Sequence, residues 1–439
     1  MDKENIKRYL LDFNNRKFKL IEREIAIKES NKIQTVIGAR RVGKTYLLFN
    51  KIKLLEESGI QRNQIIYFNF ESPILSDVSY KEISELIEIQ WSIFPDIIKK
   101  KIYIFIDEPQ AVSKWELAIR DIYDRYNCHI FLTGSSSKLL SKEIATSLRG
   151  RSITNLLLPL SFKEFLIFKG LIFDKNKINT EIKSKIINYF EEYLLFGGYP
   201  EVVLENDNNE KMKIVKDYFD MVIYKDIVER YNLKNTKLIK WLMNSLINSI
   251  SKEFSINNLF NTLKSQGIKI SKNTLYSYFN IFEDSFFIFA LRKFEHSEKK
   301  RGLSIPKIYL DDISFLNLFS IQEYGKRLEN IVFLQLLRQK NQNPLINISY
   351  WKSIDNKEVD FIVTEGKKVT RIIQVCNSLS DENTKKRETK SLIAALKYFN
   401  IKEGIIITNE DNYKEEEIEG KKIKIIPLWK LLLEESFKK

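Results

Sequence analysis

Residues 35–45 read TVIGARRVGKT, and this stretch decides the fold of the first third of the chain. It fits the pattern G-x-x-x-x-G-K-[ST], whose fixed positions are filled by Gly38, Gly43, Lys44 and Thr45. An apolar run at 33–37 precedes it and a helix-prone run at 46–57 follows it. Because strand, glycine-rich loop and helix come in this order, we predict a loop that binds phosphate.

The chemistry of such a loop assigns roles to its residues. Glycines let the backbone curl so that N–H groups point at phosphate oxygens, and the positive end of the next helix adds to the attraction. Lys44 would neutralise charge on the β- and γ-phosphates, and Thr45 would offer its hydroxyl to Mg²⁺. A glycine turn that carries Lys-Thr by chance is the alternative. We expect ATP with Mg²⁺ to be held by Gly38, Ala39, Arg40, Arg41, Val42, Gly43, Lys44 and Thr45.

A second stretch, KIYIFIDEPQ at 101–110, supports this interpretation. Its five apolar residues at 102–106 predict a buried strand of a parallel sheet. The strand ends in Asp107 and Glu108, at the edge where open α/β sheets bind ligands. We expect Asp107 to hold Mg²⁺ through water and Glu108 to polarise the attacking water, a solvated acid pair being the alternative.

Two further runs, at 64–70 and 128–132, predict buried strands of the same sheet. The second is followed by Thr-Gly-Ser-Ser, and a small hydroxyl at a strand end can touch the γ-phosphate or orient the water. Ser135 or Ser136 is the candidate, with Thr133 as a further one and a plain polar turn as the alternative. The alternation of strands and helices predicts an α/β fold with a doubly wound parallel sheet.

Residues 147–151 read SLRGR and supply two candidate catalytic arginines, Arg149 and Arg151. Arginine is always charged and forks onto phosphate oxygens, so either could act on the γ-phosphate from its own chain or from a neighbouring subunit. A surface salt bridge is an equally weighted alternative.

The order of these motifs resembles that of the prokaryotic AAA-type ATPases that carry a nuclease-like C-terminal domain of unknown function. The distinctive parts are the Arg-Arg pair inside the loop, LPLSFKEFL at 158–166 and FGGYPEVV at 196–203. The resemblance covers nearly the whole chain. It implies that Asp107 and Glu108 are the Walker B pair and that Ser135 lies at the sensor position, but it implies no biological role. Residues 161–232 would form a helical lid, in which GGYP is a tight turn that serves as a hinge or touches the nucleotide.

The segment 233–322 predicts a winged helix-turn-helix, because two helices with serine N-caps flank a glycine turn and a strand follows. Lys272, Asn273 and Tyr276 would lie near the start of the second of these helices, where such modules contact bases. A module that serves only packing or subunit contact is the alternative.

The segment 323–439 resembles a restriction-endonuclease-like α/β domain with a defect. Glu329 on a helix and Asp360 on a strand fit, but Gln374 and Cys376 stand where the signature has Glu and Lys. An amide binds Mg²⁺ less well than a carboxylate, and a thiol supplies no cationic stabilisation. We therefore predict a degenerate nuclease fold, although Glu329 and Asp360 could still bind a metal weakly.

Composition sets outer limits. The chain has 439 residues and a net charge of +14, but a general richness in Lys, Asn and Ile makes that charge weak evidence for nucleic acid. Two cysteines argue against a disulfide framework, and two histidines against a multi-histidine metal centre. No apolar run approaches the ~20 residues of a membrane helix, so we expect a cytoplasmic protein without membrane contact.

Together these observations predict a P-loop ATPase core at 1–160, the lid at 161–232, the winged helix at 233–322 and the nuclease-like domain at 323–439. The expected function is a Mg-dependent ATPase that drives a conformational change in modules that bind DNA or a protein partner, in a chain that could form a homo-oligomer. An ATP-gated nuclease and a nucleotide switch or DNA-binding regulator that does not hydrolyse ATP are the alternatives.

Overall fold

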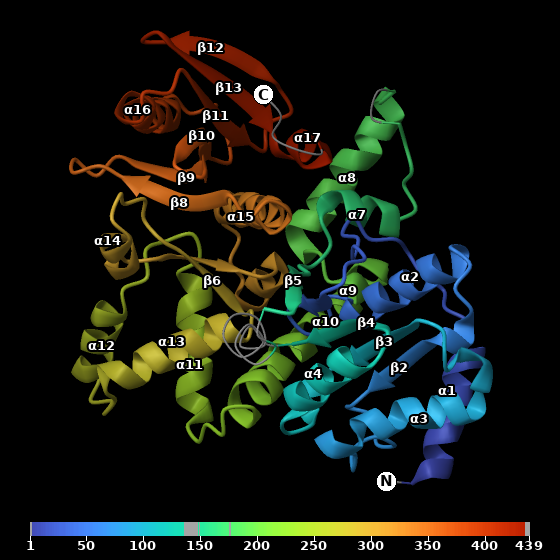
Figure 1. Ribbon diagram of the computed structural model, residues 1–439. Helices are drawn as coiled ribbons and strands as arrows, with labels where there is room; N and C mark the ends of the chain where they lie inside the picture. The colour runs from blue at the N-terminus through green and yellow to red at the C-terminus, as the bar shows by residue number, and fades with distance from the viewer. Residues whose placement is uncertain (1, 136–147, 149, 175–176, 435–439) are drawn as a thin grey trace. The chain divides into compact units, whose positions relative to one another are not determined.

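The computed structural model describes residues 2–135, 148, 150–174 and 177–434 (Figure 1). The chain forms two compact units, Met1–Leu157 and Leu158–Lys439. Among the described residues, no helix has the length and apolar character needed to cross a lipid bilayer.

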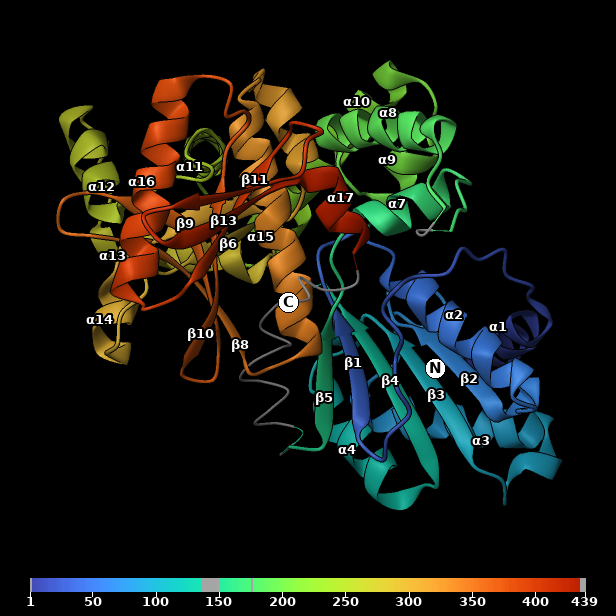
Figure 2. The ribbon, with the colours of Figure 1, turned by 90° about the horizontal axis from the view of Figure 1, so that it is seen from above.

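The first unit is built on a parallel sheet of five strands, which lie side by side in Figure 2. Their order across the sheet is β2 (Ile65–Asn69), β3 (Ile102–Asp107), β4 (Cys128–Gly134), β1 (Ile33–Ile37) and β5 (Ser152–Leu156). Every neighbouring pair is parallel. The predicted parallel sheet is therefore confirmed, and β4 lies between β1 and β3.

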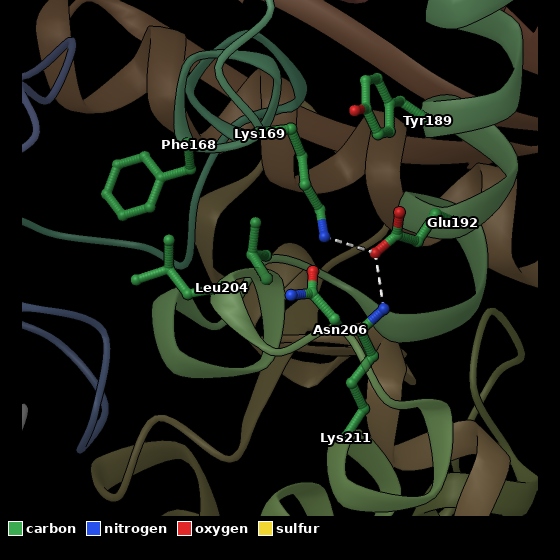
Figure 3. A pocket seen from close by; sticks show the side chains of 8 residues that line it. Phe168, Lys169, Tyr189, Glu192, Leu204, Asn206 and Lys211 are labelled. Carbon is green, nitrogen blue, oxygen red and sulfur yellow. Dashed lines mark hydrogen bonds and ion pairs between the residues drawn. The ribbon is translucent and has the colours of Figure 1, made fainter.

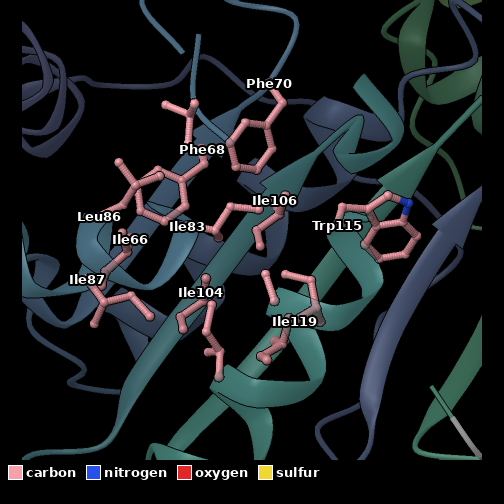
Figure 4. Packing of buried hydrophobic residues seen from close by; sticks show 14 of the residues in the cluster. Ile66, Phe68, Phe70, Ile83, Leu86, Ile87, Ile104, Ile106, Trp115 and Ile119 are labelled. Carbon is pink, nitrogen blue, oxygen red and sulfur yellow. The ribbon is translucent and has the colours of Figure 1, made fainter. Parts of the chain in front are cut away.

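Helices cover both faces of this sheet. Helix α2 (Lys44–Glu57) packs on one face, and the other is covered by α1 (Lys3–Asn15), α3 (Ile83–Ile93) and α4 (Trp115–Arg125). Figure 4 shows this second layer, where Ile104 and Ile106 of β3 pack against Ile83, Leu86 and other apolar side chains. Each such side chain stabilises the fold by roughly 1.5–3 kcal/mol. Short 3₁₀ turns lie at Arg62–Gln64, Tyr80–Glu82, Pro95–Ile97 and Pro109–Ala111.

The second unit begins with a group of helices. They are α7 (Phe162–Phe168), α8 (Thr180–Phe196), α9 (Pro200–Leu204) and α10 (Asn208–Met221), which continues as a π-helix over Val222–Glu229. The Leu-Pro-Leu-Ser-Phe run is a helix start, because Ser161 and Glu164 cap α7 reciprocally, at 3.1 Å and 2.9 Å.

Three helices and a two-stranded antiparallel sheet follow. They are α11 (Thr236–Asn248), α12 (Ile256–Ser265), α13 (Lys272–Asp284), β6 (Ile288–Leu291) and β7 (Lys307–Leu310), with α14 (Glu298–Leu303) between the two strands. Ser255 and Ser271 cap α12 and α13 as expected. A 3₁₀ segment over Ile313–Phe319 leads to the last part of the unit.

That last part is a mixed sheet of six strands with three helices. The strand order is β12 (Lys414–Ile418), β13 (Lys421–Pro427), β11 (Glu403–Thr408), β10 (Lys368–Val375), β9 (Glu358–Glu365) and β8 (Ile346–Lys352). The helices are α15 (Tyr324–Gln342), α16 (Glu382–Tyr398) and α17 (Leu428–Leu433).

The Gly-Gly-Tyr-Pro turn is tied to residues more than a hundred positions away. Gly197 ends α8, the Gly198 N–H donates to Asp312 Oδ2 at 2.7 Å, and the Tyr199 hydroxyl donates to Asp311 Oδ2 at 2.7 Å. Both aspartates are buried, which raises their pKa values. We call this arrangement the turn clasp; it gives the glycines a packing role within the second unit.

Gly197→Ala should lower the stability of the second unit more than Gly170→Ala. Both glycines have a positive φ, of 72° and 74°, but a Cβ at Gly197 would lie 1.8 Å from Asp312 Oδ1, whereas a Cβ at Gly170 meets nothing within 4 Å. We expect about 1–2 kcal/mol for the control and at least ~2 kcal/mol more for Gly197→Ala, measured by urea unfolding. Equal losses of stability in the two variants would show that the turn clasp can shift to accommodate the added Cβ without cost.

Candidate nucleotide-binding site

The glycine-rich loop joins the end of β1 to the start of α2 and needs its glycines. Gly38 has φ 155°, and a Cβ there would lie 2.1 Å from the carbonyl oxygen of Leu157. Gly43 has φ 96° and is the N-cap of α2. Arg41 also has a positive φ, of 67°. The loop therefore wraps the N-terminus of a 14-residue helix, whose unpaired N–H groups favour an anion.

Lys44 lies in the first turn of α2 with 6% of its surface exposed. Its ammonium donates to the carbonyl oxygens of Gly38 and Ala39, at 3.2 Å and 3.0 Å, and lies 3.7 Å from Glu108 Oε1. The positive charge is thus held against the loop that the sequence predicts to enclose phosphate. A phosphate oxygen, which carries charge, is a stronger acceptor than these carbonyls.

Asp107 ends β3, and its carboxylate is hydrogen-bonded by hydroxyl groups from three neighbouring elements. It accepts hydrogen bonds from Thr45 Oγ1 at 2.5 Å, from Tyr67 at 3.1 Å and from Thr133 Oγ1. Burial raises the pKa of Asp107, while the hydrogen bonds from Thr133 and Thr45 act in the opposite direction. The two residues predicted to hold Mg²⁺, Thr45 and Asp107, are therefore in direct contact.

The oxygen donors of this pair suit Mg²⁺, which usually takes one or two protein oxygens and completes its shell with water and phosphate. Within the described ranges, no three His, Cys, Asp or Glu side chains form a group that could hold a metal. A magnesium ion at Thr45 and Asp107 would therefore depend on the nucleotide for further ligands.

Glu108 has an unusual backbone and several partners. Its φ is 52°, a conformation that costs energy in a non-glycine residue. Its N–H donates to Thr133 Oγ1 at 3.3 Å, and its Oε2 accepts from the Ser135 N–H, also at 3.3 Å, and from the Gln110 amide. Residues at the ends of β3 and β4 thus hold this carboxylate 3.7 Å from the Lys44 ammonium.

The candidate arginines are placed differently. Arg151 precedes β5, its carbonyl accepts from the Ile33 N–H at 2.8 Å, and its guanidinium lies 3.1 Å from Asp124. Because β1 and β5 are parallel, this is the amino-terminal edge of the sheet, and five strand residues of ~3.3 Å each separate it from the loop edge. Arg151 therefore does not join the loop site of its own chain. Arg149 and Ser136 lie outside the described residues.

The two arginines inside the loop are placed differently from the buried Lys44. The Arg40 guanidinium pairs with Glu71 at 3.2 Å, and Arg41 is exposed. The Val42 carbonyl accepts from Arg23 at 2.8 Å, a contact that the sequence did not suggest.

Two further residues of the site escaped sequence reasoning. Tyr67 of β2 pairs with Phe105 of β3. Because side chains alternate between the two faces of a strand, Tyr67, Phe105 and Asp107 all lie on the face of the sheet that α2 covers. Gln110 follows Glu108 by two residues, and nothing in its sequence context marks it.

A second cluster of charges lies in the second unit and involves a lysine that sequence reasoning missed. Lys307 on β7 is 2% exposed, and its ammonium lies 2.9 Å from Asp360, 3.3 Å from Glu329 and 2.7 Å from Glu358. The two candidate metal ligands, Glu329 and Asp360, thus hold a protein ammonium. Burial and the nearby Asp360 raise the pKa of Glu329 to about 8, against the effect of Lys307.

The neighbouring positions are also engaged. The Asp360 carboxylate accepts from the Val375 N–H at 2.9 Å, and the Gln374 amide donates to Glu388 at 2.6 Å. Burial raises the pKa of the Cys376 thiol to about 12, which keeps it uncharged at neutral pH.

Comparisons with known proteins cover most of the chain. A family model described as an AAA domain matches residues 30–166, and two models described as domains of unknown function, DUF8612 and DUF4143, match residues 187–324 and 324–431. The uncharacterized protein MJ1544 of Methanocaldococcus jannaschii is 39% identical over 94% of this chain and 91% of its own length. An uncharacterized protein of Haemophilus influenzae is 30% identical over 94% of this chain and 97% of its own length.

Among solved structures, the Aeropyrum pernix ORC1 protein in complex with DNA is 11% identical with a TM-score of 0.31, over 76% of this chain and 94% of that one. The glycine-rich loop and the five-stranded parallel sheet agree with the AAA match. The chain belongs to the family of these relatives, a family of AAA-type P-loop ATPases with C-terminal domains of unknown function.

Proposed function

We propose that the chain binds ATP with Mg²⁺ at residues 38–45 and hydrolyses it. The observation that carries this proposal is the convergence of Lys44, Thr45, Asp107 and Glu108 at one edge of the sheet, through contacts of 2.5–3.7 Å. In nucleotide-binding folds of this type, that edge is where phosphates lie.

In this proposal each residue has a distinct task. Lys44 leaves the Gly38 and Ala39 carbonyls and donates to phosphate oxygens. Thr45 and, through water, Asp107 would hold Mg²⁺, whose charge would offset that of the phosphates. Glu108 accepts a proton from the attacking water, and the Ser135 N–H and Gln110 fix its orientation.

Nucleotide binding should depend on Lys44. We expect Lys44→Ala to weaken ATP binding at least ~30-fold in isothermal titration calorimetry with Mg²⁺, because charge-assisted hydrogen bonds to phosphate are lost. The control Lys53→Ala removes an exposed lysine of the same helix and should change the affinity less than about twofold. If titration of the unaltered protein with ATP and Mg²⁺ gives no heat of binding, the proposal that the chain binds ATP is wrong.

We further propose that hydrolysis drives a change in the modules of the second unit, which contact nucleic acid or a protein partner. The elements α11 to β7 support a winged helix-turn-helix at 233–322, since three helices precede an antiparallel pair of strands. Lys272, Asn273 and Tyr276 are exposed on the first turns of α13, the position of a recognition helix. The helices α7 to α10 would be the lid at 161–232, and the core would span 1–160.

DNA binding by this module should weaken as salt rises, because phosphate contacts release counterions. In fluorescence anisotropy, we expect Lys272→Ala with Asn273→Ala to lower the affinity for duplex DNA ~10-fold. Lys237→Ala, an exposed lysine on α11, serves as the control. No binding at low salt would contradict DNA contact and favour the alternative that the module contacts protein.

A nuclease is not favoured. The segment 323–439 supports a restriction-endonuclease-like core in its mixed sheet, but the Lys307 ammonium lies between Glu329 and Asp360, where a divalent cation would have to bind. A switch that binds ATP without hydrolysing it is distinguished by the hydrolysis assay described in the Discussion.

A further inference from the structure

A cavity of about 310 Å³ opens among the helices of the second unit (Figure 3). Side chains from α8, α9 and α10, the end of α7 and the segment after α9 line it. Its volume lies at the small end of the range of ligand pockets, ~300–1,000 Å³. None of its residues belongs to the candidate nucleotide site.

The charges around the cavity do not balance. The ammonium groups of Lys169 and Lys211 lie 2.8 Å and 2.7 Å from the same oxygen, Oε1 of Glu192, as Figure 3 shows. Burial opposes ionisation of Glu192, but the hydrogen bonds from the two lysines outweigh it and lower the pKa of Glu192. Among the lining residues, one carboxylate therefore stands beside two ammonium groups, while the Glu205 carboxylate, outside the lining, also interacts with Lys211. Lys211 is 3% exposed, so water screens its charge poorly.

Further hydrogen-bonding groups line the same space. The Tyr189 hydroxyl and the Asn206 amide belong to the lining, and in the described part of the chain neither side-chain group makes a hydrogen bond. Phe168 and Leu204 supply apolar surface beside them, and Figure 3 shows both at the opposite side from Glu192. The lining thus combines two ammonium groups against one carboxylate, two polar groups without a hydrogen bond to the protein, and an apolar wall.

We propose that this cavity binds a small organic anion, a molecule with one carboxylate or phosphate group on a short apolar or aromatic portion. The anionic group would accept hydrogen bonds from Lys169 and Lys211 and would compensate the positive charge that Glu192 alone does not neutralise. The apolar portion would lie against Phe168 and Leu204. The competing explanation is that the three charged side chains merely join α7, α8 and α10.

Calorimetric titration of the full chain with three matched probes tests the proposal. Phenylacetate and phenyl phosphate carry the two possible anionic groups on one aromatic ring, and phenethylamine carries a cation instead. We expect one equivalent of at least one anion to bind and the amine not to bind. The titrations are repeated with Lys44→Ala, which removes the main partner of a phosphate group at the nucleotide loop. Binding of a probe that persists in this variant does not take place at the nucleotide site, and so it does not depend on the proposed function.

Variants then locate the site. Lys169→Met should weaken binding ~10-fold through the loss of a charge-assisted hydrogen bond. Asn206→Asp places a negative charge on an exposed residue of the lining, which spares the fold, and should also weaken binding several-fold. Lys185→Met, an exposed lysine of α8, should leave the affinity unchanged. The proposal is overturned if neither anion binds the unaltered protein, or if Asn206→Asp and Lys169→Met bind as the unaltered protein does.

Discussion

Replacing Glu108 with Gln is expected to lower the rate of ATP hydrolysis at least ~100-fold while the affinity for ATP changes less than about threefold. The amide keeps the shape of the side chain and can still accept a hydrogen bond from the Ser135 N–H, 3.3 Å from the carboxylate. It cannot take a proton from water. The loss should therefore fall on the chemical step, and single-turnover assays with a binding titration separate the two effects.

The control for this variant is Glu57→Gln, which neutralises an exposed glutamate at the end of α2 and should leave the rate unchanged. If Glu108→Gln hydrolyses ATP as fast as the unaltered protein, Glu108 is not the base. If the unaltered protein binds ATP but shows no turnover above this variant, the nucleotide acts as a switch.

Lys307→Met is expected to destabilise the second unit by about 3–5 kcal/mol at pH 8, the range for removing one partner of a buried ion pair. The change leaves Glu329, Glu358 and Asp360 without the ammonium that they share at 2.7–3.3 Å. Lys357→Met breaks an exposed pair with Asp355 and should cost less than about 1 kcal/mol. Urea unfolding of both variants measures the difference.

The deficit of Lys307→Met should shrink in acid. The pKa of Glu329 is raised in the folded state to about 8, above its ordinary value of 4.5. A proton on this group therefore stabilises the fold, and that contribution is lost as the pH rises through this window. Without the Lys307 ammonium, protonation of the buried carboxylates relieves more of their mutual repulsion. We therefore expect Lys307→Met to lose less unfolding free energy at pH 5.5 than at pH 8. An equal loss at both pH values would contradict this account.

The sequence was informative wherever the chemistry is local to one motif or one strand end. The loop pattern and the acid pair after 102–106 predicted which side chains meet, because carboxyl ends of parallel strands share an edge of the sheet. The same rule, applied to Arg151, would have placed it at the other edge: it precedes the strand Ser152–Leu156 and does not follow it.

Contacts between distant segments could not be predicted in this way. Lys307 stands just before an apolar run, where a lysine usually reaches solvent, and its three acidic partners come from other elements. Asp312 reaches Gly198 across 114 positions, and no pattern in either segment indicates the other. Fold class and motif chemistry follow from spacing, whereas the partners of buried charges depend on tertiary packing.

The turn clasp and the Lys307 cluster bear on how the protein can be divided for study. A cut near position 232 would separate Gly198 and Tyr199 from the two aspartates, and a cut near 322 would separate Lys307 from Glu329 and Asp360. Either cut would leave buried polar or charged groups without their partners. Shortened versions that keep 158–434 intact should be recovered in solution, while pieces cut at the boundaries suggested by motif alone should aggregate or be degraded.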